Sequence, residues 1–120
     1  MRKASLSSRI LAKKFAEIAD EKKASEIVIL DMRKLVNFCD FFVLCSGNTD
    51  RQVKAIADSM DDGLHEMGIK PASKNPRGNS HWIVFDAGDV VVHIFEKNMR
   101  EFYNLEYLWQ EAKVVDWKNK

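Results

Sequence analysis

The sequence predicts one mixed α/β (α+β) domain, in which helices pack on a small mixed sheet in the order α-β-β-α-β-β-β-α. Three segments carry this prediction. The run DFFVLCSG (40–47) is apolar without alternation, as in a strand covered on both faces. The segment NTDRQVKAIADSMDDGLHEMG (48–68) repeats apolar residues at helical spacing. The segment HWIVFDAGDVVVHIF (81–95) has the pattern of a β-hairpin around Ala87-Gly88.

The beginning of the chain is interpreted as an amphipathic helix. The opening MRKASLSSRILAKKFA is basic and contains serines, features that transit peptides share. A helix is favoured because apolar residues recur there at helical spacing: Leu11, Phe15, Ile18 and Ala19. The short β-branched run EIVIL (26–30) then predicts the first strand.

The helix predicted over 48–68 has recognisable ends. Thr49 followed by Gln52 has the spacing of a capping box, and Gly68 is a typical C-terminal stop. Its apolar stripe consists of Val53, Ile56, Ala57, Met60, Leu64 and Met67.

The second half of the chain completes the predicted sheet. IKPASK (69–74) is a candidate short strand, which Pro71 places at an edge. After the hairpin, NMREFYNLEYLWQEA (98–112) predicts one helix whose apolar band is wider than a surface helix needs. We therefore expect a single domain over residues 1–112 and a loose C-terminal tail over 113–120.

Composition limits the classes of function. Nineteen basic and eighteen acidic residues leave a net charge of +1, which argues against binding of nucleic-acid phosphates as the main role. No direct sequence-specific nucleic-acid binding is expected. No apolar run reaches the length of a membrane span. Cys39 and Cys45 lie about 20 Å apart in one extended segment, too far for a disulfide, so both are expected to be reduced thiols in a cytosolic protein. Cys45 is expected to pack as a small hydrophobic residue.

The sequence holds no strong catalytic or metal motif. His65, His81 and His93 have neither a histidine partner at i+4 nor a Cys/His cluster at zinc spacing, so no metal is expected. The turn SGNTD (46–50) could hold an anion at a helix N-terminus, but one glycine without a fuller motif favours a plain strand-to-helix turn.

The strand order and the Ser46-Gly47 turn are similar to the core of nucleotidyltransferases. Those enzymes need a pair of carboxylates on a strand to hold two Mg²⁺ ions. Asp86 and Asp89 instead flank a tight turn, as solvated turn residues do. The prediction is a nucleotidyltransferase-like core without the catalytic carboxylates and without a cofactor. An enzyme or nucleotide-binding protein of that type is the alternative function.

The two faces of the hairpin differ in character. With Ala87-Gly88 as the loop, Phe85 would pair with Val90, Ile83 with Val92, and Trp82 with His93. One face then has the composition of a core layer. The other is too apolar to be freely solvated, and its members are Trp82, Val84, Val91, His93 and Phe95. From the residues alone, either a helix or a binding partner could cover this second face.

Three blocks of the chain resemble the ribosomal silencing factors, also called the Iojap family. They are DFFVLCSGNTDRQVKAIAD (40–58), HWIVFDAGDVVVHIFE (81–96) and REFYNLEYLW (100–109), and with the first helix the likeness covers about residues 7–110. The chain departs from the family pattern at Cys45-Ser46-Gly47, where a Thr-Gly pair is usual, and at Ala87 and Asn104.

The resemblance implies a specific, non-enzymatic function. Members bind the large ribosomal subunit through the ribosomal protein numbered fourteen, exclude the small subunit and so repress translation. Several members are homodimers, and the lack of a long N-terminal extension favours the bacterial cytoplasmic form. The implied docking residues are Trp82, Asp89, His93, Tyr103 and Trp109, with Phe102 and Leu105 in support. Trp82 and Tyr103 would be aromatic anchors, and Asp89 would meet basic groups of the partner.

Overall fold

The computed structural model describes residues 6–68, 73–74 and 81–118 of the chain. In chain order the elements are α1 (Leu6–Glu21), β1 (Ser25–Asp31), β2 (Phe41–Gly47), α2 (Asp50–Glu66), β3 (Ser73–Lys74), β4 (Trp82–Asp86), β5 (Val90–Glu96), α3 (Lys97–Tyr103), α4 (Leu105–Leu108) and β6 (Lys113–Val115). The mixed α/β class and the order of elements through α3 agree with the sequence analysis.

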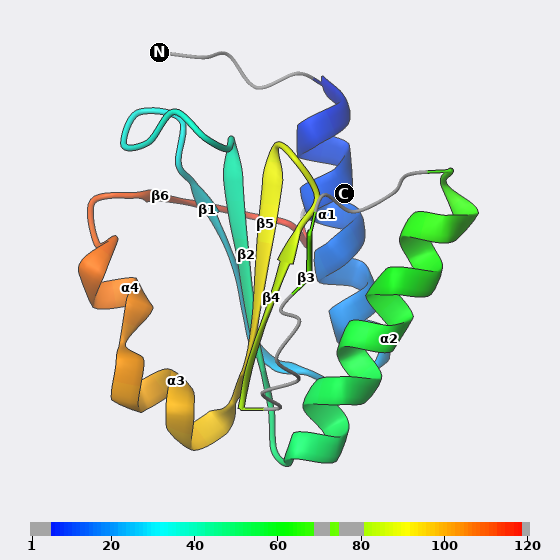
Figure 1. The fold of residues 1–120 in the computed structure, drawn as a ribbon. Helices are drawn as coiled ribbons and strands as arrows, with labels where there is room; N and C mark the ends of the chain where they lie inside the picture. The colour runs from blue at the N-terminus through cyan, green and yellow to red at the C-terminus, as the bar shows by residue number, and fades with distance from the viewer. Residues whose placement is uncertain (1–5, 69–72, 75–80, 119–120) are drawn as a thin grey trace.

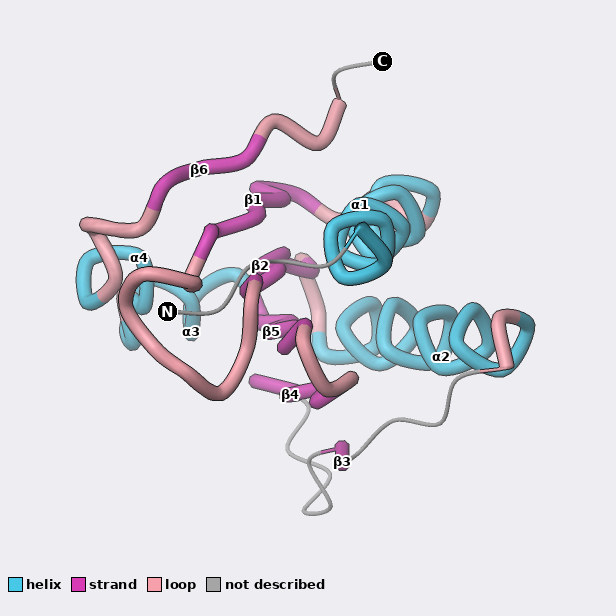
Figure 2. Tube along the Cα trace, turned by 90° about the horizontal axis from the view of Figure 1, so that it is seen from above, coloured by secondary structure: helices cyan, strands magenta, loops and turns pink. Residues whose placement is uncertain are grey.

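A single mixed sheet forms the centre of the domain. Over the described residues it has six strands in the order β3-β4-β5-β2-β1-β6. Helices α1 and α2 cover one face, and α3 and α4 lie on the opposite side (Figures 1 and 2). The two described residues of the predicted segment 69–74, Ser73 and Lys74, do form an edge strand, and the rest of that segment lies outside the described residues.

Strand β2 is the middle of this arrangement. All seven of its residues are buried, which confirms the expected strand covered on both faces. It pairs antiparallel with β1 and parallel with β5, with Phe42 beside Val91 and Leu44 beside His93. A parallel pair requires a crossover connection, which here contains α2 and the β3–β4 edge of the sheet.

The sheet has a hydrophobic core on each face. The first core lies under α1 and α2, and it contains the predicted stripes of both helices except Met67, which is exposed. The second core contains Leu30, Met32, Cys39, Phe42, Leu44, Val91 and Phe95. Neither Cys39 nor Cys45 is in a disulfide, as predicted, and both are buried. Burial raises the pKa of the Cys45 thiol to about 12.

The N-terminus of α2 is capped as the sequence predicts. The Thr49 hydroxyl accepts a hydrogen bond from the Gln52 amide at 3.1 Å, and the Gln52 side-chain oxygen accepts one from the Asn48 amide at 2.7 Å. The Gln52 amide group also donates to the carbonyls of Lys22 and Lys23 just after α1. The cap therefore joins the start of α2 to the end of α1.

The hairpin pairing expected from the sequence is wrong by two residues. Trp82 pairs with Phe95, and the further pairs are Ile83–Ile94, Val84–His93 and Phe85–Val92. The loop is Gly88-Asp89, closed by the Ala87 amide donating to the Val90 carbonyl at 3.0 Å. Gly88 takes a positive φ of 87°, and its amide donates to the Asp86 carboxylate at 2.9 Å. Because side chains alternate with period two, this shift leaves both faces as predicted.

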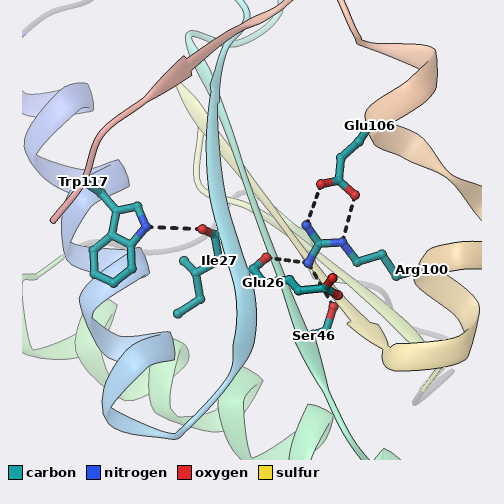
Figure 3. A network of polar contacts seen from close by, with 6 residues as sticks. All are labelled: Glu26, Ile27, Ser46, Arg100, Glu106 and Trp117. Atoms are coloured by element: carbon teal, nitrogen blue, oxygen red, sulfur yellow. Dashed lines mark hydrogen bonds and ion pairs between the residues drawn. The ribbon is translucent and has the colours of Figure 1, made fainter.

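Two predictions about the C-terminal region are corrected. The single helix expected over 98–112 is broken at Asn104, whose left-handed conformation (φ 49°, ψ 54°) ends α3 before α4 begins. The expected loose tail over 113–120 begins with β6, which pairs antiparallel with β1. The Trp117 indole also donates to the Ile27 carbonyl at 3.3 Å (Figure 3). The folded domain therefore extends past residue 112, because β1 offers a free edge to the β-branched pair Val114-Val115.

Candidate docking surface

The second face of the sheet carries a cluster of rings centred on Phe42. The Phe42 ring lies 4.7 Å from that of His93 and 6.0 Å from that of Trp109, both in edge-on geometry. The Phe38 ring lies 6.4 Å from that of Phe42. We call these rings, together with Trp82 and Phe95, the aromatic cluster. Edge-to-face pairs of this kind add to the stabilisation from burial alone.

Trp82 is attached to the cluster by two contacts. Its ring stacks on Phe95 with centroids 5.1 Å apart and an interplanar angle of 25°. Its indole N–H donates to Nδ1 of His93 at 3.2 Å. The ring of Trp82 is half-buried, so one part belongs to the second core and another part remains accessible.

His93 lies beneath the surface. It is only 7% exposed, and burial lowers the pKa of its imidazole to about 4. Because Nδ1 accepts the Trp82 hydrogen bond, the neutral ring carries its proton on Nε2, which has no hydrogen-bond partner among the described residues. His93 thus supports Trp82 from below, and it is neither a proton shuttle at neutral pH nor an exposed contact residue.

A pH-dependent loss of stability is expected from His93. Its folded pKa lies below the unfolded value of about 6.5, so the unfolded chain binds the proton more tightly. The contribution of the neutral His93 ring to the free energy of unfolding is fully present above about pH 6.5. It is lost as the pH falls towards about 4, by up to about 3 kcal/mol. Urea unfolding between pH 7.5 and pH 4, with NMR titration of the imidazole, measures this loss.

The control for this titration is His93→Leu, which removes the titrating group. Its free energy of unfolding should vary less over the same pH range than that of the unmodified protein. A native His93 imidazole that takes up its proton near its ordinary pKa would contradict the burial described above.

Four exposed apolar side chains come from the loop before β2 and from helices α3 and α4. Phe38 is 59% exposed, Phe102 75%, Tyr107 67% and Leu108 66%. With the half-buried Trp82, Val84 and Trp109, we define these residues as the candidate surface. Most of them come from the β1–β2 loop, α3, α4 and the turn that follows, on the side of the sheet away from α1 and α2 (Figure 2). Trp82 and Val84 belong to β4, a strand of the sheet itself. An apolar surface of this kind on a folded domain is characteristic of a protein-interaction site.

The structure brings some of the predicted docking residues together and separates others. His93 and Trp109 both contact Phe42, Trp82 contacts His93, and Phe102 lies exposed on α3. Tyr103 and Leu105 flank the break at Asn104, but their side chains lie outside the described part of the chain. Asp89 is in the hairpin loop at the opposite end of β5 from α3 (Figure 1). Its carbonyl accepts from the Asp40 and Phe41 amides.

Four members of the candidate surface are absent from the docking residues predicted from the sequence: Phe38, Val84, Tyr107 and Leu108. The sequence assigns Val84 only to the second face of the hairpin. For Tyr107 and Leu108 a signal existed in the unusually wide apolar band of 98–112, which a helix packed on the sheet cannot bury completely. For Phe38 no local pattern distinguishes an exposed loop phenylalanine from a core one.

A buried arginine anchors α3 to the sheet beside this surface (Figure 3). Arg100 is 4% exposed, and its Nη1 donates to the Glu26 carbonyl at 2.5 Å and to the Ser46 hydroxyl at 2.9 Å. Its Nε and Nη2 donate to the two carboxylate oxygens of Glu106 at 2.9 and 2.8 Å. The Ser46 hydroxyl, in the turn considered above as an anion site, is therefore already bonded to the guanidinium of Arg100. The charge of that guanidinium is paired with Glu106.

The described residues offer little for a metal or a large cofactor. None of them form a group of three His, Cys, Asp or Glu side chains able to hold a metal ion. A cavity of about 230 Å³ lies on the other face of the sheet, between α1 and β6, and its lining includes Arg9, Lys13, Phe41, Asp116 and Trp117. This volume is below the roughly 300–1,000 Å³ of typical ligand pockets.

A mixed α/β domain with exposed apolar and aromatic residues has the features of a protein-binding domain. Comparison with known proteins specifies the class. Residues 5–120 match the family model "Ribosomal silencing factor during starvation". The chain therefore belongs to the ribosomal silencing factor family, which confirms the resemblance found in the sequence. The name of the family describes a regulator.

The relatives include bacterial and plastid proteins. Ribosomal silencing factor RsfS of Bacillus subtilis is 39% identical, with 92% of this chain and 94% of that protein covered. The chloroplast protein Iojap of Zea mays is also 39% identical, over 84% of this chain and 44% of the maize protein. A crystal structure from Chromobacterium violaceum has a TM-score of 0.82 at 32% identity, covering 86% of each chain. One from Bacillus halodurans has a TM-score of 0.76 at 37% identity, covering 93% of this chain and 99% of that chain.

None of the helices in the described residues has the length and apolarity needed to span a membrane.

Proposed function

We propose that this protein represses translation by binding the large ribosomal subunit through the ribosomal protein numbered fourteen and excluding the small subunit. The observation that carries the proposal is the candidate surface, an apolar aromatic face in a chain of the ribosomal silencing factor family. Large aromatic side chains in well-packed positions contribute most of the binding energy in many protein interfaces. Trp82 and Trp109 meet this description, because each is half-buried and packed on the aromatic cluster.

The proposed mechanism is steric. The domain measures 36 × 33 × 31 Å, so when bound at the joining face of one subunit it occupies space that the other subunit needs. No bond is made or broken, and no cofactor is required. A near-neutral chain with a net charge of +1 suits a protein partner better than bare RNA.

Asp89 can belong to the same interface only if the interface is broad. The seven residues of β5 separate it from the α3 end, a distance of about 20 Å in a strand. A standard interface buries about 800 Å² per partner, a patch roughly 30 Å across, so both ends of the hairpin fit within one. As part of this proposal, Trp82, Phe102, Tyr103, Leu105 and Trp109 make contact, Asp89 orients the partner, and His93 supports Trp82.

The family resemblance adds three further elements to the proposal. They are a bacterial cytoplasmic location, a possible homodimer, and a core of nucleotidyltransferase type. The alternative function, a nucleotidyltransferase-like enzyme or nucleotide-binding protein, has less support. Asp86 is used to accept the Gly88 amide, and Ser46 is bonded to Arg100.

Sedimentation with purified ribosomal subunits tests the proposal. The protein should co-sediment with isolated large subunits and not with small ones. Added to large subunits before the small ones, it should lower the yield of joined ribosomes, and it should do so less when added after joining. A protein that leaves large subunits unbound would contradict the proposal, and nucleotide-dependent chemistry in the purified protein would favour the alternative.

A further inference from the structure

The short helix α4 has little of its own to keep it in place. It spans four residues, Leu105–Leu108, which is too short for helical hydrogen bonds to stabilise it alone. Tyr107 and Leu108 are 67% and 66% exposed, so they contribute little burial against the domain. Their amides both donate to the Asn104 carbonyl, at the residue where the chain turns between the two helices. Among the described side chains, contacts on either side of these two residues hold α4 in position.

Two such contacts are present. After α4, the Trp109 ring packs edge-on against Phe42. Within α4, the Glu106 carboxylate receives two parallel hydrogen bonds from the guanidinium of Arg100. A bidentate pair of this type defines direction as well as distance, because the guanidinium is a rigid planar fork.

The guanidinium is itself held in one orientation by the sheet (Figure 3). One of its bonds goes to the Ser46 hydroxyl near the end of β2, and another to the Glu26 carbonyl. Glu26 has a positive φ of 51° at the point where the pairing of β1 with β2 is irregular. Arg100 is thus held by the start of β1 and the end of β2, and it in turn holds the Glu106 carboxylate on α4.

We infer that Arg100 and Glu106 are positioning residues of the docking surface: their ion pair sets where α4 presents Tyr107 and Leu108. This inference rests on the proposed function, and neither side chain needs to touch the partner. When the pair is intact, the apolar side chains of α4 are ordered before binding. When it is broken, α4 can turn about Asn104, and the binding reaction must order it again at a cost in affinity.

Glu106→Gln is the main test, since Glu106 is 41% exposed and the change preserves its size. We expect affinity for isolated large subunits to fall about tenfold through lost preorganisation. The variant should be less stable, because the buried Arg100 loses its counter-ion, but it should remain folded at the temperature of the binding experiment. The matched control is Glu101→Gln, which removes the same charge from an exposed position on α3 outside this network. The control should bind as the unmodified protein does.

A double-variant comparison separates positioning from direct contact. Arg100→Lys keeps the buried positive charge but cannot hold both carboxylate oxygens. If the two residues act as a pair, the double variant should bind about as weakly as the weaker single variant. If Glu106 touches the partner by itself, the two losses should multiply, and that result would overturn the inference.

Hydrogen exchange supplies a readout that does not involve the ribosome. The amides of Tyr107 and Leu108 should exchange faster in Glu106→Gln than in Glu101→Gln, because α4 has lost its anchor. Equal exchange rates in both variants would overturn the positioning inference even if the unmodified protein binds large subunits. Failure of the unmodified protein to bind large subunits would instead overturn the proposed function, so the two failures are distinguishable.

Discussion

Replacing Leu108 by aspartate is expected to reduce binding to isolated large ribosomal subunits by at least about 100-fold, because the new carboxylate would be buried without a partner. Leu108 is 66% exposed in the free domain, so the substitution removes little internal packing. Changes at such exposed positions usually alter stability by no more than about 0.5 kcal/mol. Co-sedimentation over a range of protein concentrations measures the binding loss, and thermal unfolding measures stability.

The control for this prediction is Ile10→Asp. Ile10 is 58% exposed and also lies on a helix, but α1 covers the opposite face of the sheet (Figure 1). This variant introduces the same charge into an apolar side chain of similar exposure, and it should keep its affinity. Equal losses in the two variants would mean that charge alone controls binding. Full binding by Leu108→Asp would remove α4 from the docking surface.

Replacing Phe42 by alanine should destabilise the fold by about 3–5 kcal/mol, the usual cost of deleting a buried aromatic ring. Phe42 is 4% exposed and is the ring that His93, Trp109 and Phe38 all contact. Its loss leaves a cavity at the centre of the aromatic cluster and removes the support of Trp109. The free energy of unfolding in urea provides the measurement.

Phe38→Ala is the matched control, because it deletes the same side chain from a neighbouring ring that is 59% exposed. Its cost should stay below about 1 kcal/mol, since most of the ring is already in contact with water. It should nevertheless weaken large-subunit binding, because Phe38 is a member of the candidate surface. Similar destabilisation by both variants would show that the cluster is not organised around Phe42.

The half-buried residues of the candidate surface are less informative targets than these. Trp82→Ala removes a possible anchor, but it also deletes the stack on Phe95 and leaves His93 without its indole donor. Two ring nitrogens of a buried histidine would then lack partners, which carries its own cost in stability. A weakened Trp82 variant therefore combines two effects, whereas Leu108 and Phe38 report mainly on binding.

The sequence by itself determined those features that depend on neighbours along the chain. The spacing of Thr49 and Gln52 predicted the cap of α2, and the unbroken apolar run predicted β2 as a strand buried on both faces. Alternation along the hairpin assigned each side chain to its face, and this assignment holds although the partners were wrong. A period of two specifies the face of a residue but not the residue opposite it. The family could also be recognised, because its three blocks are continuous segments.

Only the tertiary structure decided how the second face is covered and where the candidate surface lies. The break at Asn104 depends on a local conformation that the helical pattern of 98–112 conceals. Arg100 then holds the two helices on either side of this break to the sheet, and its partners Glu26 and Ser46 are 74 and 54 residues away in the sequence. Strand β6 forms because the edge of β1 is available for pairing. Phe42 is the centre of the aromatic cluster because β5 places His93 beside it and the turn after α4 places Trp109 beside it. Periodicity records contacts a few residues apart, whereas these contacts form between segments that meet only in the folded chain.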